Sequence, residues 1–481
     1  MRSTLFHLTL ALGVFLPAIV AQGSSGNTMK KPSSLTYITH VTVVDATAGI
    51  DIPDRTVIIS SGRIVEVTAS KSARPRSKQV LEGKGKFLIP GLWDMHVHAV
   101  SAERLDSMLP MFVANGVLGI RDMGTSMALE EIDQLRKATQ TGARLGPLIV
   151  AAGPILDGRP KPLRANFLAI NSPEAGRAEV DALKSSGADF IKVYSFLSKD
   201  TFLAIADEAR KQKIFVAGHV PFSVSALEAS DAGFNSMEHL FGVFLSCSSR
   251  EDELRAEMLK GGPNLGGWDQ IQLEALDAAD SYDAAKAAKV FAHLAKNGTW
   301  QVPTLTAVWA HARGFDAQVT SDPRLRYIPL SVRQRWSEEA KSSTHTASIA
   351  KFYEQKLRML GDLHRAGVPV MAGTDAAWYQ AYTYAGFSLH DELALLARAG
   401  FTPAEALQSA TIDPARFLRM DRDMGSIDKG KRADLVLLAA DPLQDVANTQ
   451  KIEAVIVGGR VLERKALDSL LADAENAVKS R

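Results

Sequence analysis

Two histidines in the segment IPGLWDMHVH, residues 89–98, have a spacing that indicates chemistry. They are His96 and His98, two of the eleven histidines in the chain. Side chains alternate along a β-strand, so these two imidazoles share one face and Val97 points the opposite way. Because imidazole nitrogens are common ligands of zinc and similar divalent ions, the pair indicates part of a metal site.

Four further polar residues lie in or at the end of other apolar, strand-like runs. They are Lys192, His219, His239 and Asp375. A single histidine at a strand end is more often a structural group, and a lone aspartate after Gly-Thr can cap a helix. Lys192 is harder to explain in that way, because an unpaired lysine in an apolar strand is costly. The joint occurrence at five strand ends outweighs the separate structural explanations.

The elements that must position these residues alternate between strands and helices from about residue 88 to 420. Helix signals are clear: Ser172 and Pro173 begin one helix and Gly187 stops it, and Thr402 with Glu405 forms a capping box. Eight strand candidates lie at residues 87–98, 117–122, 148–152, 190–194, 214–219, 236–239, 300–304 and 369–375.

Eight such strand–helix units predict an α/β fold, a distorted (β/α)8 TIM barrel, whose active site lies at the carboxyl ends of the strands. Gaps of about sixty residues before and after the seventh strand are expected to hold extra helices. A doubly wound open sheet is the alternative, but no GxGxxG motif follows the first strand.

Both ends of the mature chain are rich in alternating, strand-like segments. A Ser-Gly turn lies in the N-terminal pair, and Gly458 and Gly459 mark a turn near the C-terminus. Since terminal strands tend to pair, residues 35–88 and 421–466 are predicted to form one small β-sandwich. The barrel then occupies residues 89–420, and residues 467–481 form a C-terminal tail.

The N-terminus reads as a secretory signal peptide over residues 1–23, followed by a linker at 24–34. A basic start precedes an apolar run from Leu5 to Val20 and small residues, and this run is short for a transmembrane helix. We therefore expect a secreted or periplasmic protein with no stable membrane insertion after signal removal. The net charge of +1 gives no indication of a nucleic-acid partner, and the single Cys247 excludes an intrachain disulfide.

The polar residues suit two divalent ions rather than one, because five such ligands exceed one tetrahedral coordination shell. Two groups would hold one ion each: His96, His98 and Asp375, and His219 and His239. A neutral Lys192 amine that captures carbon dioxide becomes a carbamate, whose two oxygens could bridge ions roughly 3.5–4 Å apart. A bridging hydroxide would be nucleophilic near neutral pH, and Asp375 would pass its proton to the leaving group.

Together these residues resemble the amidohydrolase superfamily, specifically its imidazolonepropionase-like and Xaa-Pro dipeptidase-like branch. The resemblance runs from about Leu35 to Arg464 and rests on PGLWDMHVH, GADFIKVY, AGHVP, SMEHL, AGTDA, SLHDELALLARAGFTPAEALQSAT and GSIDKGKRADLVLL. It implies a distorted barrel, a β-sandwich from both chain ends and metal-dependent hydrolysis. It also implies roles by motif: His96 and His98 as first-strand ligands, Lys192 as the carboxylated bridge, His219 and His239 as ligands of the second ion, and Asp375 as ligand and acid/base.

Two departures from the family bear on the substrate. Deaminases and imidazolonepropionases usually carry an acid or amide shortly after the fifth-strand histidine, where this chain has HVPF, and their single-metal chemistry does not need Lys192. The loop YSFLSKD lacks the glycine-rich run of several dipeptidase relatives, which leaves the dipeptide substrate open.

The leading hypothesis is a binuclear hydrolase that cleaves a C–N amide bond in a dipeptide, Xaa-Pro-like substrate or N-acyl amino acid. Zinc is the first choice of metal, with manganese, cobalt or iron as alternatives. Tyr194, Arg121 and His390 are candidate substrate contacts, and a homo-oligomer is a further possibility. Alternatives are a lactone, ester or phosphoester hydrolase on the same site, a mononuclear deaminase or imidazolonepropionase-type enzyme, and a non-catalytic binding barrel.

Overall fold

A computed structural model describes residues 35–77, 79–262, 272–342 and 346–479. The predicted signal peptide and linker, residues 1–34, lie outside these ranges. Within the described ranges, none of the helices combines the length and the apolar character that crossing a membrane requires.

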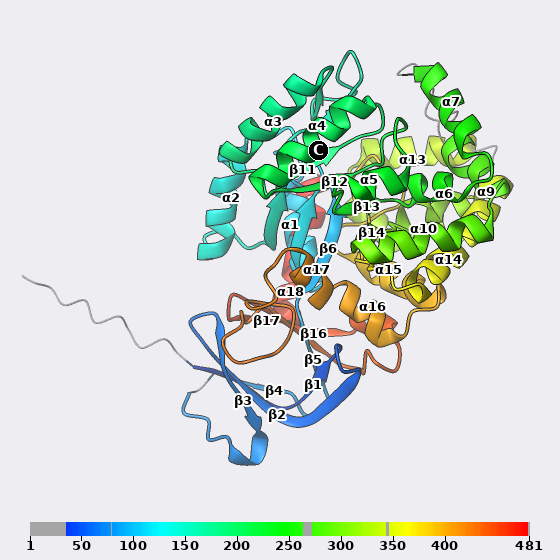
Figure 1. Cartoon of the computed structure of the whole chain (residues 1–481). Helices are drawn as coiled ribbons and strands as arrows, with labels where there is room; N and C mark the ends of the chain where they lie inside the picture. Colours follow the sequence, from blue (N-terminus) through cyan, green and yellow to red (C-terminus); the bar gives the residue numbers. More distant parts are fainter. Residues whose placement is uncertain (1–34, 78, 263–271, 343–345, 480–481) are drawn as a thin grey trace, which may run out of the picture. The chain divides into compact units, whose positions relative to one another are not determined.

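Strands from both ends of the chain share one eight-stranded sheet (Figure 1). Its order is β17-β16-β15-β5-β1-β2-β3, with β4 also paired to β1. β5 joins the two ends, because it pairs parallel with β1 and antiparallel with β15. The strands are β1 (Thr36–Asp45), β2 (Ile50–Ser60), β3 (Arg63–Ala69), β4 (Gln79–Glu82), β5 (Phe87–Pro90), β15 (Leu435–Leu438), β16 (Ile452–Val457) and β17 (Arg460–Glu463).

One hydrophobic cluster fills the core of this sheet and draws on both chain ends. Ile64 of β3 and Ile456 of β16 belong to it, although β3 is at one end of the sheet order and β16 is next to the other end. The turns at Gly62 and Gly458 also meet, since a methyl group on Gly62 would lie 3.0 Å from the Gly458 carbonyl oxygen. The N- and C-terminal strands therefore enclose one shared core, although their hydrogen bonds define a single sheet.

The middle of the chain builds parallel sheets, which makes the fold α/β, as the alternation predicts. One sheet has the order β6-β7-β8 and the other β10-β9-β11-β12-β13-β14. The strands are β6 (Leu92–Val97), β7 (Val117–Asp122), β8 (Leu148–Ala151), β9 (Ile155–Asp157), β10 (Phe167–Ala169), β11 (Phe190–Val193), β12 (Phe215–Gly218), β13 (Ser236–Glu238) and β14 (Trp300–Val302).

Seven of the eight strand candidates are assigned as strands, and the first divides into β5 and β6 at Gly91. The eighth, residues 369–375, makes only isolated parallel bridges: Val370 to Gln301 of β14, and the next residue, Ala376, to Val97 of β6. Among the described residues, strand assignment therefore gives two parallel sheets linked by this segment, not a closed ring.

Gly373 explains how the eighth segment approaches β6 so closely. A methyl group on this glycine would lie 2.9 Å from Cβ of His96 and 2.5 Å from Cγ1 of Val302. The absence of a side chain lets the backbone nitrogen of Asp375 donate a hydrogen bond of 2.7 Å to the carbonyl oxygen of His96. Residues almost 280 positions apart are thus placed side by side.

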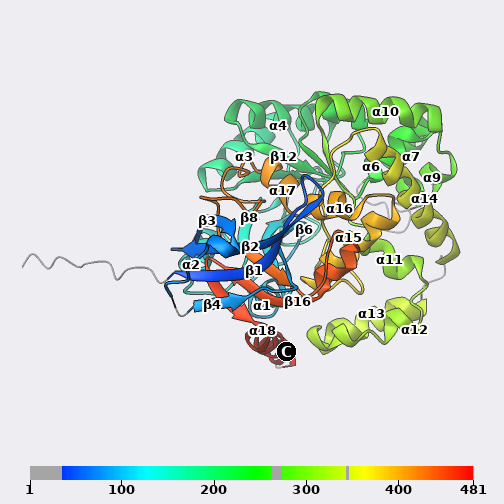
Figure 2. The same ribbon diagram turned by 90° about the horizontal axis from the view of Figure 1, so that it is seen from below.

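Helices connect the parallel strands (Figure 2), and two long insertions flank β14 in the sequence. Predicted caps are present: Ser172 Oγ accepts from Ala175 N at 3.2 Å, and Thr402 and Glu405 form the capping box. The expected tail is part of α18, which buries Leu467.

The first nine helices are α1 (Leu105–Ala114), α2 (Leu129–Thr141), α3 (Pro173–Ser185), α4 (Lys199–Gln212), α5 (Ala226–Asp231), α6 (Phe241–Cys247), α7 (Glu251–Gly261), α9 (Ala278–Asp280) and α10 (Ala284–Asn297). The others are α11 (Thr306–Ala312), α12 (Ala317–Thr320), α13 (Leu330–Ser342), α14 (Thr346–Arg365), α15 (Phe387–Arg398), α16 (Pro403–Ser409), α17 (Ile412–Phe417) and α18 (Arg464–Lys479). Shorter turns are η1 (Ser70–Ser72), η3 (Gln272–Asp277), η4 (Pro323–Tyr327) and η5 (Val446–Gln450).

Candidate metal centre

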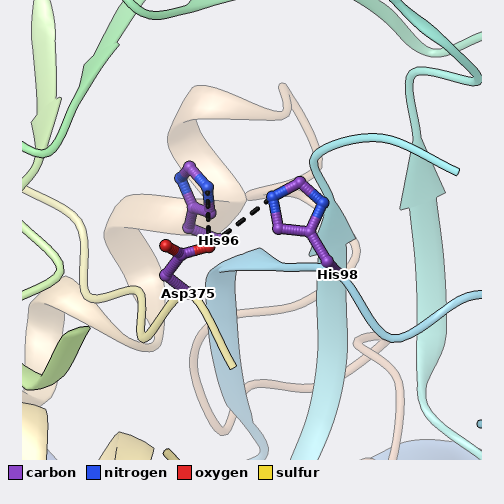
Figure 3. A group of neighbouring side chains, drawn as sticks. All are labelled: His96, His98 and Asp375. Carbon is purple, nitrogen blue, oxygen red and sulfur yellow. Dashed lines mark ion pairs between the residues drawn. The ribbon is translucent and has the colours of Figure 1, made fainter. Parts of the chain in front are cut away.

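Three of the predicted ligands converge at the carboxyl end of β6 (Figure 3). Nε2 of His96 and Nε2 of His98 each lie 3.5 Å from Oδ1 of Asp375. One potential ligand atom from each residue lies within 4.8 Å of the other two, and all three residues are buried. Nε2 of His96 and Oδ1 of Asp375 have no hydrogen-bond partner among the described residues. Buried polar atoms of this kind need a partner, and a divalent cation fits these donors.

The hydrogen bonds behind the histidines also fit metal binding. Nδ1 of His96 donates to Glu238 Oε2 at 2.7 Å, and Nδ1 of His98 donates to the Gly124 carbonyl oxygen at 3.2 Å. Because a carboxylate and a carbonyl accept only, the ring proton stays on Nδ1. The lone pair is then left on Nε2, the nitrogen that faces Asp375.

His219 and His239 form a second group that adjoins the first. The ring of His239 lies 4.6 Å from the ring of His96 and 4.8 Å from that of His219, measured between centroids. Both use Nδ1 as well: His219 lies 3.0 Å from Ser195 Oγ, and His239 lies 2.7 Å from Thr304 Oγ1. All four predicted histidines therefore leave Nε2 as the nitrogen for a ligand.

Lys192 is buried and acts electrostatically on both groups. It stands on β11, and its Cδ would be 3.0 Å from a methyl group placed on Gly218 of β12, so this glycine leaves room for the lysine side chain. Burial lowers the pKa of Lys192 to about 8. Its charge also contributes to lowering the pKa of His96, His98, His219 and His239, after the larger effect of burial. The amine is thus within electrostatic reach of all four rings.

Asp375 is held in a strained and dry position. Its backbone φ is +58°, in the left-handed region, and the Gln380 side chain donates to Oδ2. Burial raises the pKa of Asp375 to about 7. In the absence of a cation, this carboxylate therefore costs free energy when it is ionised.

Asp94, on the same face as His96, has a scaffold role. Its Oδ1 accepts from Thr374 N at 3.0 Å and its Oδ2 accepts from Thr374 Oγ1 at 2.7 Å. These bonds join β6 to the segment that carries Asp375. Asp94 thereby fixes the distance between candidate ligands, His96 and Asp375, that lie almost 280 positions apart in the sequence.

Arg121, a predicted substrate contact, has a different position from the one expected. It is fully buried, and its guanidinium donates to Met95 O at 2.6 Å, Ser236 Oγ at 3.2 Å and Glu238 Oε1 at 2.9 Å. The charge of Arg121 is therefore neutralised by Glu238, the residue that orients His96. This geometry assigns Arg121 to the support of the metal centre and leaves it no surface for a substrate.

The other two candidate substrate contacts, Tyr194 and His390, lie in different surroundings. Tyr194 stacks against His219, with ring centroids 4.0 Å apart, and so borders the metal centre. His390 does not: its Nδ1 lies 2.9 Å from Thr449 Oγ1 and its Nε2 lies 3.0 Å from the Asn115 carbonyl oxygen. Both nitrogens of His390 are occupied by groups of the protein, away from the ligand cluster.

Sequence reasoning missed several residues of the centre. Glu238 precedes His239 in the motif SMEHL, but strand alternation predicts that these two neighbouring side chains point to opposite faces. Tyr379, whose ring centroid lies 5.4 Å from that of His98, and Lys356, whose charge lowers the pKa of His239, follow no strand pattern. Such contributions from loops and outer helices carry no periodic signal.

Comparison with known proteins identifies the family. A model of the amidohydrolase family matches residues 87–462. The chain belongs to the amidohydrolase family. It is accordingly a hydrolase that acts on carbon–nitrogen bonds.

Individual relatives of this amidohydrolase are distant. An uncharacterised protein of Mycobacterium tuberculosis is 26% identical over 436 residues, 86% of this chain and 94% of that protein. A 5-methylthioadenosine/S-adenosylhomocysteine deaminase of Thermoanaerobacter pseudethanolicus is 22% identical over 267 residues, 52% of each chain. A solved Xaa-Pro dipeptidase with bound methionine aligns with a TM-score of 0.65 at 20% identity, over 89% of this chain and 100% of that one. Bottromycin amidohydrolase aligns with a TM-score of 0.70 at 23% identity, over 92% and 90%.

Replacing Glu238 by glutamine is expected to weaken metal binding. The amide can present its NH2 group to Nδ1 of His96, which no longer forces the lone pair onto Nε2. We expect the affinity for Zn²⁺ to fall by roughly 10–100-fold, measured by competition with a chelator. Glu339→Gln is the matched control, because Glu339 accepts from His311 Nε2 at 2.6 Å away from the centre. Equal affinities for Zn²⁺ in the two variants would contradict the orienting role.

Replacing Asp375 by asparagine is expected to change how stability depends on pH in metal-free protein. The pKa of Asp375 is about 7 when folded, against an ordinary 3.8, so between these values the folded state binds more protons than the unfolded one. Its contribution to stability is therefore lost as pH rises from about 4 to about 7. The melting temperature of Asp375→Asn minus that of the wild type should increase across this window and then level off. A difference that is independent of pH would refute the assignment.

Proposed function

We propose that this amidohydrolase is a binuclear metal enzyme that cleaves the amide bond of dipeptides, Xaa-Pro-like substrates or N-acyl amino acids. One observation carries the proposal. Three buried histidines and the partly buried His219 use Nδ1 in hydrogen bonds and leave Nε2 for a ligand, and Lys192 lies within electrostatic reach of all four. The likeness in fold to a Xaa-Pro dipeptidase supports the choice of substrate class.

In this proposal the residues divide between two divalent ions, most simply zinc. His96, His98 and Asp375 would hold one ion, His219 and His239 would hold the other, and Lys192, once carboxylated by carbon dioxide, would supply anionic oxygen ligands to both. The lowered pKa of Lys192 favours this modification, because only the neutral amine reacts. When bound, the ions supply Lewis acidity, which polarises the scissile carbonyl and lowers the pKa of water.

The residues of the chain then manage the proton and the substrate. Asp375, with its pKa near neutrality and its position beside His96 and His98, accepts a proton from the attacking water and returns it to the leaving amine. Tyr194, stacked on His219, contacts the substrate from the β11 side. Burial of these groups strengthens each of these electrostatic interactions.

We also propose a domain architecture, a location outside the cytoplasm and an oligomeric state for the enzyme. The parallel strands and the segment 369–375 form a distorted (β/α)8 barrel over residues 89–420, and residues 35–88 with 421–466 form a β-sandwich around their shared core. The protein is exported by the signal peptide at residues 1–23 and acts on a small-molecule or dipeptide-like substrate, without nucleic acid, as a homo-oligomer.

A deaminase is the second candidate, because a deaminase is among the relatives. The amide-hydrolase proposal is favoured over it by Lys192, which lies within electrostatic reach of all four histidines. It is favoured also by Val220, Pro221 and Phe222, which supply no acid or amide after His219.

Two measurements test the proposed function. Elemental analysis should find two tightly held divalent ions per chain, and fewer than one would contradict the binuclear centre. Purified protein should then be screened against dipeptides and N-acyl amino acids, each paired with its ester or lactone analogue, and against adenosine-type amines. We expect turnover of amides; turnover restricted to esters, lactones or amines would refute the amide proposal.

Replacing Lys192 by alanine should remove both metal and activity. The loss follows from the missing bridge, and a short carboxylic acid such as propionate should restore part of the activity by supplying two oxygens in its place. Metal content and turnover with and without propionate provide the readout. Lys199→Ala, which removes an exposed lysine paired with Glu228 at 2.6 Å, is the control. Full activity in Lys192→Ala would exclude the carbamate.

A further inference from the structure

A second buried lysine, Lys356, faces the metal centre from an outer helix. It lies on α14 and has no exposed surface, and its Nζ has no hydrogen-bond partner among the described residues. Among the described residues, no carboxylate oxygen lies within 4.0 Å of Nζ, the distance at which the two would form an ion pair. An uncompensated ammonium in such a place costs free energy, so it calls for an anionic partner.

The direction of the side chain follows from its neighbours on α6. Nζ lies 5.5 Å from the centroid of the Phe241 ring, and that ring lies 5.8 Å from the ring of His239. Phe352 of α14 also meets Phe241, with centroids 6.2 Å apart, so the two helices lie side by side (Figures 1 and 2). Lys356 thus stands one aromatic ring away from a predicted metal ligand.

The acid that acts most strongly on Lys356 is already engaged. Glu392 is buried on α15, and its two carboxylate oxygens accept from the backbone nitrogens of Leu305 and Thr306, both at 2.8 Å. These bonds tie Glu392 to the start of α11. Glu392 therefore reduces the cost of the charge on Lys356 at a distance, while the ammonium has no hydrogen-bond partner among the described residues.

We propose that Lys356 binds the free carboxylate of the substrate, with the half-buried ring of Phe241 as the apolar surface beside it. This rests on the proposed function, since dipeptides and N-acyl amino acids carry a carboxylate close to the scissile amide. The lysine approaches the site from the side of His239, whereas Arg164, which lies over the Tyr379 ring at 4.5 Å, is on the side of His98. Lys356 thus determines specificity for acids over their neutral analogues.

The test compares an acid with its amide in matched variants. The wild type should prefer an N-acyl amino acid over its C-terminal carboxamide in kcat/KM. In Lys356→Met the value for the acid should fall by about tenfold or more, while that for the carboxamide changes by less than about threefold. Lys351→Met, on the same helix and paired with Asp280 at the surface, should behave like the wild type.

A binding measurement separates this proposal from the proposed function. N-acetyl-L-proline should stabilise wild-type protein against heat more than N-acetyl-L-prolinamide does, with and without added Zn²⁺, and Lys356→Met should abolish the difference. That result would support Lys356 even if no amide is hydrolysed. Equal losses for acid and carboxamide would overturn the proposal, as would a preference that survives in Lys356→Met and disappears in Arg164→Met.

Discussion

Burial of the ligand groups away from water is the constraint on which the rest of this centre depends. His96, Lys192 and Asp375 have almost no exposed surface, and burial is the first cause of each of their pKa shifts. In such surroundings a charge is tolerated only when it is neutralised, so the histidines are neutral and the lysine and aspartate titrate near neutrality. A site of this kind is arranged to receive positive charge from outside the chain.

The supporting hydrogen bonds show how the fold meets that constraint. Arg121 on β7 holds Glu238 on β13, and Glu238 holds His96 on β6. Asp94 holds the segment that carries Asp375. Each link crosses from one strand to another, so the ligand geometry depends on the whole set of parallel strands. Membership of the amidohydrolase family agrees with a centre built at the strand ends and supported from beneath.

The long insertions on either side of β14 give the centre its outer wall. α6, which carries Phe241, lies in the insertion before β14, and α14, which carries Lys356, lies in the insertion after it. Barrel folds commonly keep their ligand chemistry on the strands and vary their substrate contacts in the surrounding loops and helices. The same division is present here, because the candidate metal ligands lie on or next to strands and in the eighth segment, whereas Lys356 lies on a helix.

The sequence by itself determined the α/β class, the capped helices and seven of the eight strands that it predicted, but not β9 and β10; it also predicted the residue types of the candidate metal centre. These follow from local rules: alternation along a strand, capping chemistry and the cost of a lysine in an apolar run. Only the tertiary structure decided that Arg121 supports Glu238, that His390 is bound to Thr449 and Asn115, and that Lys356 lies against Phe241, the neighbour of His239. Those contacts join residues far apart in the chain, where no periodicity records which side chain meets which. The eighth segment was determined partly by its sequence and partly by tertiary contacts. Its sequence predicted a strand, but its close approach to His96 at Gly373 set its actual path, in which it makes two isolated bridges.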